Sequence, residues 1–219
     1  MEHIVDEALR YLGAGGSEDD AVRADVAAMA DRLTAAVQPR YTFRVCALER
    51  TDAGFRLPEA NILLPGADAE KMLAQCGRAV LLACTLGAQF DNLLRAEQAR
   101  DMAGAVILDA CGSAWVEAGC DRAEKELAAR MPDCFLTDRF SPGYGDLPLS
   151  LQPEICSALD AQRRLGLHVT EHFLLNPSKS VTAVIGLSDR PQAARIRGCG
   201  YCAMRETCAL RKGGKSCAD

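Results

Sequence analysis

The sequence predicts an α+β domain, with a mixed or antiparallel sheet flanked by helices, followed by a short tail of different character. Helical and strand patterns do not alternate in a regular βαβ rhythm, so a wound parallel sheet is not expected. The 219 residues are 49% hydrophobic and 25% charged, which is ordinary for a globular protein with one substantial core. A change in charge and cysteine content divides the chain into a body, residues 1–188, and a tail, residues 189–219.

Apolar spacing in the first third of the chain predicts three helices and a strand pair. The expected helices cover 2–13, 19–37 and 68–76, and the expected strands cover 41–49 and a short partner near 54–64. Ser17 or Asp19 could cap the second helix. The glycine run from Gly13 to Gly16 lies between helices and does not follow a strand, so we interpret it as a linker.

The rest of the body is predicted to be mixed. The expected elements are a buried strand at 78–87, helical residues 88–130 with a break near 100–104, a strand at 134–138, a helix at 150–165, and a β-pair of 168–175 with 179–188. Pro132 ends the long helical stretch, and Gly166 is a plausible stop for the later helix.

Charge and hydropathy limit the partners. The net charge of −5 and the pI near 5.3 argue against nucleic-acid binding. From Arg190 to Asp219 there are seven Lys and Arg against two Asp and Glu, or +5, so the first 189 residues carry −10. No apolar run reaches the roughly 18 to 20 residues of a membrane span. The N-terminal segment has an acidic, amphipathic pattern and does not resemble a signal peptide, so we expect a cytosolic protein.

The segment RFSPGYGDLP, residues 139–148, is poorly suited to a core and well suited to holding a small polar ligand. Proline fixes φ and glycine permits positive φ, so the backbone follows a constrained path that exposes N–H and C=O groups. Arg139 can grip a carboxylate by two parallel hydrogen bonds, and Tyr144 offers a flat face and a hydroxyl. These residues suit a ligand with a carboxylate and a ring or a cation; a turn with a surface arginine is the alternative.

Two linked motifs carry a family resemblance. RFSPGY, from Arg139 to Tyr144, resembles the RxxxGY signature of the activation domain of cobalamin-dependent methionine synthase, which binds S-adenosylmethionine (AdoMet). After a helix, a second stretch is similar to that family at Gly166, Thr170, Glu171, Phe173, Pro177, Ser180 and Val181. The resemblance covers residues 139–181 and implies an activation-domain-like fold in a free-standing form, of the kind found beside methionine synthases that lack their own.

The resemblance also implies residue roles. The implied AdoMet-binding set is Glu117, Arg139, Ser141, Pro142, Gly143 and Tyr144. Arg139 would hold the ligand's carboxylate, and Glu117 on the long helix would hold its amino group. Tyr144 would lie where the ligand meets the corrinoid, and the implied partner contact consists of Tyr144, Gly145 and Asp146.

The chain departs from the family pattern in three places. After Gly-Tyr the family continues Pro-Ala-Cys-Pro, where this chain has Gly145, Asp146, Leu147 and Pro148. Aromatics that the family uses against adenine are not recognisable after Ser188. An acidic ligand-binding residue from the family's N-terminal part also has no clear match, so the sequence assigns no adenine contact.

The tail contains four cysteines in the pattern C-x2-C-x5-C-x8-C. Thiolates at this spacing could bind zinc or an iron–sulfur cluster, and the implied ligands are Cys199, Cys202, Cys208 and Cys217. Free or redox-active thiols are the alternative. The other cysteines lie mostly beside apolar residues and are expected to be buried thiols: Cys46, Cys76, Cys84, Cys111, Cys120, Cys134 and Cys156. His3, His168 and His172 do not form a metal-binding pattern.

Three functions remain open at this stage. The first is an accessory subunit for reductive reactivation of a corrinoid-dependent methyltransferase in methionine biosynthesis. This subunit would bind AdoMet and present its methyl group to the cob(I)alamin of a methionine synthase or other corrinoid protein. A flavodoxin or ferredoxin would supply the electron. The second is a redox or docking module that passes electrons from a tail cluster to a corrinoid protein without AdoMet. The third is an AdoMet sensor with no corrinoid partner.

Overall fold

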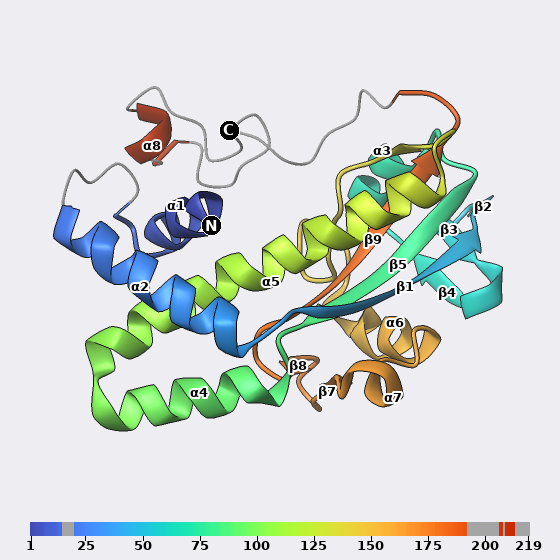
Figure 1. The fold of residues 1–219 in the computed structure, drawn as a ribbon. Helices are drawn as coiled ribbons and strands as arrows, with labels where there is room; N and C mark the ends of the chain where they lie inside the picture. Colours follow the sequence, from blue (N-terminus) through green and yellow to red (C-terminus); the bar gives the residue numbers. More distant parts are fainter. Residues whose placement is uncertain (15–19, 192–205, 208, 213–219) are drawn as a thin grey trace.

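A computed structural model of the protein describes residues 1–14, 20–191, 206–207 and 209–212. Its centre is a four-stranded sheet in the order β1-β5-β9-β6, in which every neighbouring pair is antiparallel (Figure 1). The strands are β1 (Arg40–Ala47), β5 (Arg78–Thr85), β9 (Ser180–Ser188) and β6 (Phe135–Leu136). Helices flank this sheet, so the predicted α+β class is confirmed.

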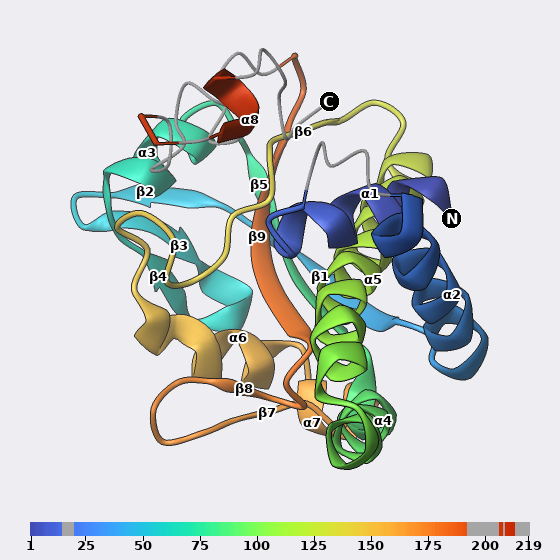
Figure 2. The same ribbon diagram turned by 90° about the vertical axis from the view of Figure 1, so that its left-hand side faces the viewer.

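One face of the sheet is covered by helices. They are α1 (Glu2–Tyr11), α2 (Asp20–Ala36), α4 (Gly87–Arg100) and α5 (Met102–Arg130). The long helix α5 crosses the sheet, and α1 and α2 pack on α5 (Figures 1 and 2). Val80, Leu82 and Cys84 of β5 point into this layer and belong to its apolar core.

The opposite face is covered by shorter elements (Figure 2). They are β2 (Glu49–Thr51), β3 (Gly54–Leu57), η1 (Pro58–Ala60), β4 (Ile62–Leu64), α3 (Ala67–Leu73), η2 (Leu149–Leu151), α6 (Gln152–Ala158) and α7 (Ala161–Leu165). Ala79, Leu81 and Ala83 of β5 belong to this second core. Because β5 is buried on both faces, it reads as a continuous apolar run, as the sequence predicted.

The expected pairing of residues 41–49 with 54–64 is wrong. β3 and β4 pair with each other and with β2 in a separate three-stranded sheet, while β1 pairs with β5 along its whole length. The long β5 offers β1 a full ladder of backbone hydrogen bonds, which two very short strands cannot supply. The segment still touches the end of β1, because the Glu59 carboxylate accepts a hydrogen bond from Ala47 N at 3.1 Å.

Two further expectations are corrected near the C-terminal half. The single helix expected at 150–165 is divided into α6 and α7 at Asp160, whose φ of 51° is left-handed. The expected helix stop at Gly166, with φ 70°, is confirmed. The expected pair of 168–175 with 179–188 is wrong: β7 (His168–Val169) pairs with β8 (Leu175–Asn176), and β9 enters the main sheet. β5 offers β9 a full ladder of backbone hydrogen bonds, and the side chains of β9 enter both apolar cores, Ile185 on the α5 side and Val184 on the opposite side.

The remaining expectations hold within a few residues. Two N-terminal helices, the break between α4 and α5, and a short strand near 134–138 all occur. Asp101 lies at the break and caps α5, since its Oδ1 accepts a hydrogen bond from Ala103 N at 3.0 Å. Ser17 and Asp19 lie outside the described residues. A last short helix is α8 (Ala209–Lys212).

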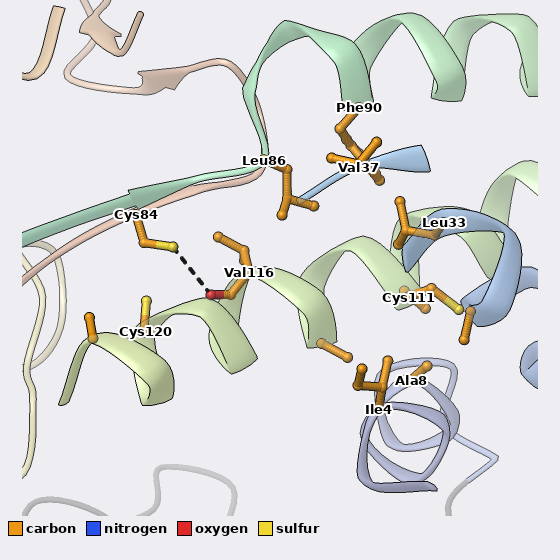
Figure 3. Close-up of a cluster of buried hydrophobic side chains, with 14 of the residues drawn as sticks. Ile4, Ala8, Leu33, Val37, Cys84, Leu86, Phe90, Cys111, Val116 and Cys120 are labelled. Atoms are coloured by element: carbon orange, nitrogen blue, oxygen red, sulfur yellow. Dashed lines mark hydrogen bonds between the residues drawn. The ribbon is translucent and has the colours of Figure 1, made fainter. Parts of the chain in front are cut away.

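A close approach of α5 to the sheet sets the position of that helix. A Cβ built on Gly119 would lie 2.5 Å from Pro39 Cβ and 2.7 Å from Cys84 Sγ, so glycine is the residue that fits. Figure 3 shows Cys84 of β5 facing Cys120 of α5 in this contact, with Cys84 Sγ donating to Val116 O at 3.7 Å. Both thiols are fully buried. Contact with Cys84 and burial raise the pKa of Cys120, so it stays a protonated, apolar neighbour.

Candidate functional site

Arg139 is positioned by backbone bonds on both sides of it. Thr137 N donates to Gly186 O at 3.0 Å. Phe140 N donates to Val184 O at 3.0 Å, and Val184 N donates to Phe140 O at 2.8 Å. Through these bonds the chain continues to pair with β9 after the two residues of β6. The segment is therefore held as an extended chain, and the Arg139 side chain reaches across to α5.

The Arg139 guanidinium is surrounded by three carboxylates of α5. Its Nη1 donates to Asp121 Oδ1 at 2.7 Å and to Glu124, and its Nη2 donates to Glu117 Oε2 at 2.5 Å. The arginine side chain is 4% exposed, whereas the three acids are 26% to 41% exposed. Three acids against one arginine leave this cluster, which we call the Arg139 cluster, with a formal charge of −2 when the acids are ionised.

Burial and ion pairing act on Arg139 in opposite directions. Burial by itself lowers the pKa of the guanidinium, but the charges of Glu117 and Glu124 outweigh it and raise the pKa above its ordinary value. Arg139 therefore stays charged at any physiological pH. A buried charge of this kind needs partners, and the helix supplies them.

The structure brings Arg139 and Glu117, two members of the implied AdoMet-binding set, into contact with each other, and their roles towards AdoMet stay a prediction. It adds Asp121 and Glu124, which the sequence analysis missed. The signal was their spacing, because residues four and seven positions after Glu117 lie on the same helix face. Tyr11 at the end of α1 is a further neighbour: burial, and then the Glu117 charge, raise the pKa of its phenol.

The loop after Arg139 is tightly turned. Gly143 and Gly145 have φ of 92° and 55°, values that glycine adopts without strain. Gly143 N donates to Leu147 O at 2.8 Å, and Tyr144 N donates to Ser141 O at 3.1 Å. Tyr144 is 73% exposed at the tip, so its ring is available to a ligand or a partner.

Asp146 fixes the base of this loop to α3. Its two carboxylate oxygens accept hydrogen bonds from Ala67 N at 2.5 Å and Asp68 N at 3.1 Å, at the N-terminus of that helix. Asp68 Oδ2 accepts from Asp146 N at 3.3 Å in return. A Cβ on Gly145 would lie 1.8 Å from Asp68 Oδ2. The local role of Gly145 and Asp146 is therefore to hold the loop, and their contact with a corrinoid partner stays a prediction.

The second motif shapes the β7–β8 hairpin and the entry to β9. Thr170 Oγ1 accepts from Leu174 N at 3.1 Å, and Phe173 has a left-handed φ of 61°. Ser180 Oγ donates to Pro177 O at 2.7 Å. Gly166 ends α7, Glu171 is exposed in the hairpin turn, and Val181 packs against the α5-side core. Within this structure the motif builds backbone geometry: Thr170 and Ser180 bond backbone atoms, and Ser180 Oγ also forms a hydrogen bond with Thr85 Oγ1 at 2.7 Å.

The four tail cysteines lie outside the described residues. Within the described part, no group of three or more His, Cys, Asp or Glu has the arrangement of a metal site. The seven body cysteines are free thiols; five are buried, and Cys76 and Cys134 are half-buried. Burial raises the pKa of Cys76, Cys111 and Cys156 to about 11, which leaves these thiols protonated at neutral pH.

Two open hollows lie away from the Arg139 cluster. One, of about 500 Å³, is lined by residues of β1, η1 and α6, including Arg44, Asn61 and Ala158. A second, of about 260 Å³, shares Arg44 and Ala158 and extends to Arg164. Neither is lined by Arg139 or by residues of its loop.

Comparison with known proteins places the fold. No protein-family model matches the sequence, and no curated protein matches it either. Among solved structures, the chain is similar to one described as "Crystal Structure of the MetH Reactivation Domain bound to AdoHcy", with a TM-score of 0.62 and 16% sequence identity. The match covers 88% of this chain and 71% of that one.

The chain therefore has a reactivation-domain-like fold, which the family resemblance had implied. At 16% identity the likeness establishes the arrangement of helices and strands and leaves the ligand to be tested. No helix in the described part of the chain is both long and apolar enough to span a bilayer.

Proposed function

We propose that this protein binds AdoMet at the Arg139 cluster and the 139–146 loop, and that it serves the reductive reactivation of a corrinoid-dependent methyltransferase. The observation that carries the proposal is the buried Arg139, tied to Glu117 on α5, beside an exposed aromatic on a glycine–proline loop. The similar solved structure is a MetH reactivation domain with AdoHcy bound.

The residues present fit the amino-acid end of AdoMet in a specific way. Glu117, Asp121 and Glu124 exceed the charge of Arg139 by two, so the cluster favours a ligand with positive groups. AdoMet carries an ammonium and a sulfonium. The ligand's carboxylate would replace one partly exposed acid on Arg139, and the displaced acid would be free to hold the ammonium.

The protein's contribution would be positioning. Arg139 and Glu117 would fix the amino-acid end, and Tyr144 on the rigid loop would face the partner's corrinoid. AdoMet would supply the methyl group to the reduced corrinoid of a methionine synthase or similar protein, with an electron from a flavodoxin- or ferredoxin-type donor.

Calorimetric titration of AdoMet and AdoHcy tests the site. We expect wild-type protein to bind AdoMet, and Glu117→Gln to weaken binding by about tenfold, because a hydrogen bond to a charged group is worth about 1.5 kcal/mol. Arg139→Lys should weaken it further, since lysine keeps the charge and loses the planar fork. AdoHcy, which lacks the sulfonium charge, should bind more weakly than AdoMet.

Glu126→Gln is the matched control for Glu117→Gln. Glu126 lies on the same helix, but its carboxylate bonds Tyr41 and Arg130 on another side. It should leave AdoMet affinity unchanged. No AdoMet binding by wild type, or equal loss in Glu117→Gln and Glu126→Gln, would contradict this placement of the ligand.

The tail supports a second candidate, a redox module that passes electrons to a corrinoid protein without AdoMet. Its basis is the sequence pattern of Cys199, Cys202, Cys208 and Cys217. Protein purified without oxygen would then contain iron and sulfide, or zinc, and Cys202→Ala should lose them. It would also reduce a corrinoid partner in the absence of AdoMet. Metal-free protein with intact AdoMet binding would rule out this candidate.

A further inference from the structure

β1 is a long edge strand with an unpaired outer side. It is the first strand in the sheet order, and its only strand partner in the described part of the chain is β5. At the other edge, β6 has only two residues. Proteins usually shorten, cover or charge such edges, because unpaired N–H and C=O groups recruit another strand.

The register identifies which backbone groups point outward. Leu48 N donates to Gly77 O, towards β5, whereas Ala47 N donates to the Glu59 carboxylate on the opposite side. Backbone groups of alternate residues point the same way along a strand. The N–H and C=O groups of Tyr41, Phe43 and Val45 therefore face away from β5, and within the described residues no hydrogen bond occupies them.

The side chains of β1 divide by the same alternation. Tyr41 donates to Glu126 of α5, and Arg130 of α5 stacks over Phe43 at 5.2 Å, so the odd residues face the α5 layer. Arg44 reaches Ala158 O and Glu59 O on the opposite side. Tyr41 and Phe43 are half-buried and Val45 is 37% exposed, which leaves an apolar row along the edge.

We propose that β1 pairs with β1 of a second copy of this chain, antiparallel and with Phe43 opposite Phe43 on a twofold axis. This register places Tyr41 opposite Val45 of the second copy, so every outward backbone pair is matched and about six inter-strand hydrogen bonds form. It also creates aromatic–aromatic and aromatic–β-branched pairs on one face, which are favourable cross-strand pairs.

Charge selects this register over its neighbours. With Phe43 at the axis, Arg44 lies opposite Thr42 and Arg40 lies opposite Cys46 of the second copy. Shifting the axis to Thr42 or Arg44 would keep the outward groups matched but would place an arginine directly opposite an arginine. Like charges directly opposite are destabilising. The strand is thus self-complementary in one arrangement, which closes as a twofold dimer.

Space for a second strand is available on one side of β1. The two hollows that share Arg44 run along the α6–α7 side of β1, where even-numbered side chains of a second strand would enter. On the α5 side, Arg130 is paired with Glu126, so its charge is balanced beside the Phe43 pair. The two four-stranded sheets would join into one continuous sheet.

Sedimentation equilibrium of the full chain, from micromolar to near-millimolar concentration, tests the dimer. We expect a monomer–dimer equilibrium, and Val45→Lys should weaken dimerisation by about tenfold or more, because lysine is a typical edge-protecting residue. Leu63→Lys is the matched control: Leu63 is 39% exposed on β4, close to the 37% of Val45, and should dimerise as wild type. Circular dichroism checks that both variants are folded.

Amide hydrogen exchange tests which residues of β1 pair with β1 of the second copy. Thr42 and Arg44 bond β5 in either state and should be protected throughout. Exchange at Tyr41, Phe43 and Val45 should slow by about tenfold or more as the dimer forms. Wild type that stays monomeric, a dimer with these three amides unprotected, or equal dimerisation of Val45→Lys and Leu63→Lys would each overturn the proposal.

Discussion

Replacing Arg139 by alanine is expected to lower the free energy of unfolding by about 2 to 3 kcal/mol. The change removes several charge-assisted hydrogen bonds and leaves three carboxylates facing one another on α5. The effect stays below that of a fully buried pair because Glu117, Asp121 and Glu124 are 26% to 41% exposed and water can solvate them. Urea unfolding at neutral pH, followed by circular dichroism, measures the loss.

Arg163→Ala is the matched control for this prediction. Arg163 is 75% exposed and pairs with Asp160 three residues before it, so its loss should change stability by no more than about 0.5 kcal/mol. Adding Glu124→Gln to Arg139→Ala should recover part of the stability, because it removes one of the repelling charges. A loss at Arg139 no larger than at Arg163, with no recovery in the double variant, would show that the cluster does not stabilise the fold.

Gly119→Val is expected to destabilise the protein by about 2 to 3 kcal/mol. Helix propensity favours valine over glycine by only about 0.4 kcal/mol. Against that small gain, even the first carbon of the new side chain would lie 2.5 Å from Pro39 Cβ and 2.7 Å from Cys84 Sγ. Either α5 or the start of β1 must move, and the same urea titration would report the cost.

The movement of α5 in Gly119→Val should also alter the Arg139 cluster. Glu117 and Asp121 lie two residues on either side of Gly119, so AdoMet affinity should fall together with stability. Gly77→Val is the control, since a Cβ at Gly77 meets no atom within 4 Å. Equal stability of the two variants would show that the approach of α5 to β5 is less tight than the structure indicates.

Much of the local structure could be predicted from periodicity. β5 has a continuous apolar run, and α5 has a helical apolar pattern that extends over many turns. The start of that pattern also predicted the break between α4 and α5. The strand pairs could not be predicted, because β3, β8 and β9 all have strand-like composition, and composition does not choose a partner. Burial of β9 on both faces decided that it, and not β8, joined the sheet.

The candidate site shows the same division. The sequence by itself determines a constrained loop, through the order Arg139-Phe-Ser-Pro-Gly-Tyr. It also determines an acidic stripe on one helix face, through the spacing of the carboxylates at 117, 121 and 124. That the arginine is buried against this stripe depends on Thr137 and Phe140 binding β9 and on α5 crossing the same sheet. Local patterns extend over a few residues, whereas these contacts join segments far apart in sequence, so only tertiary packing could decide them.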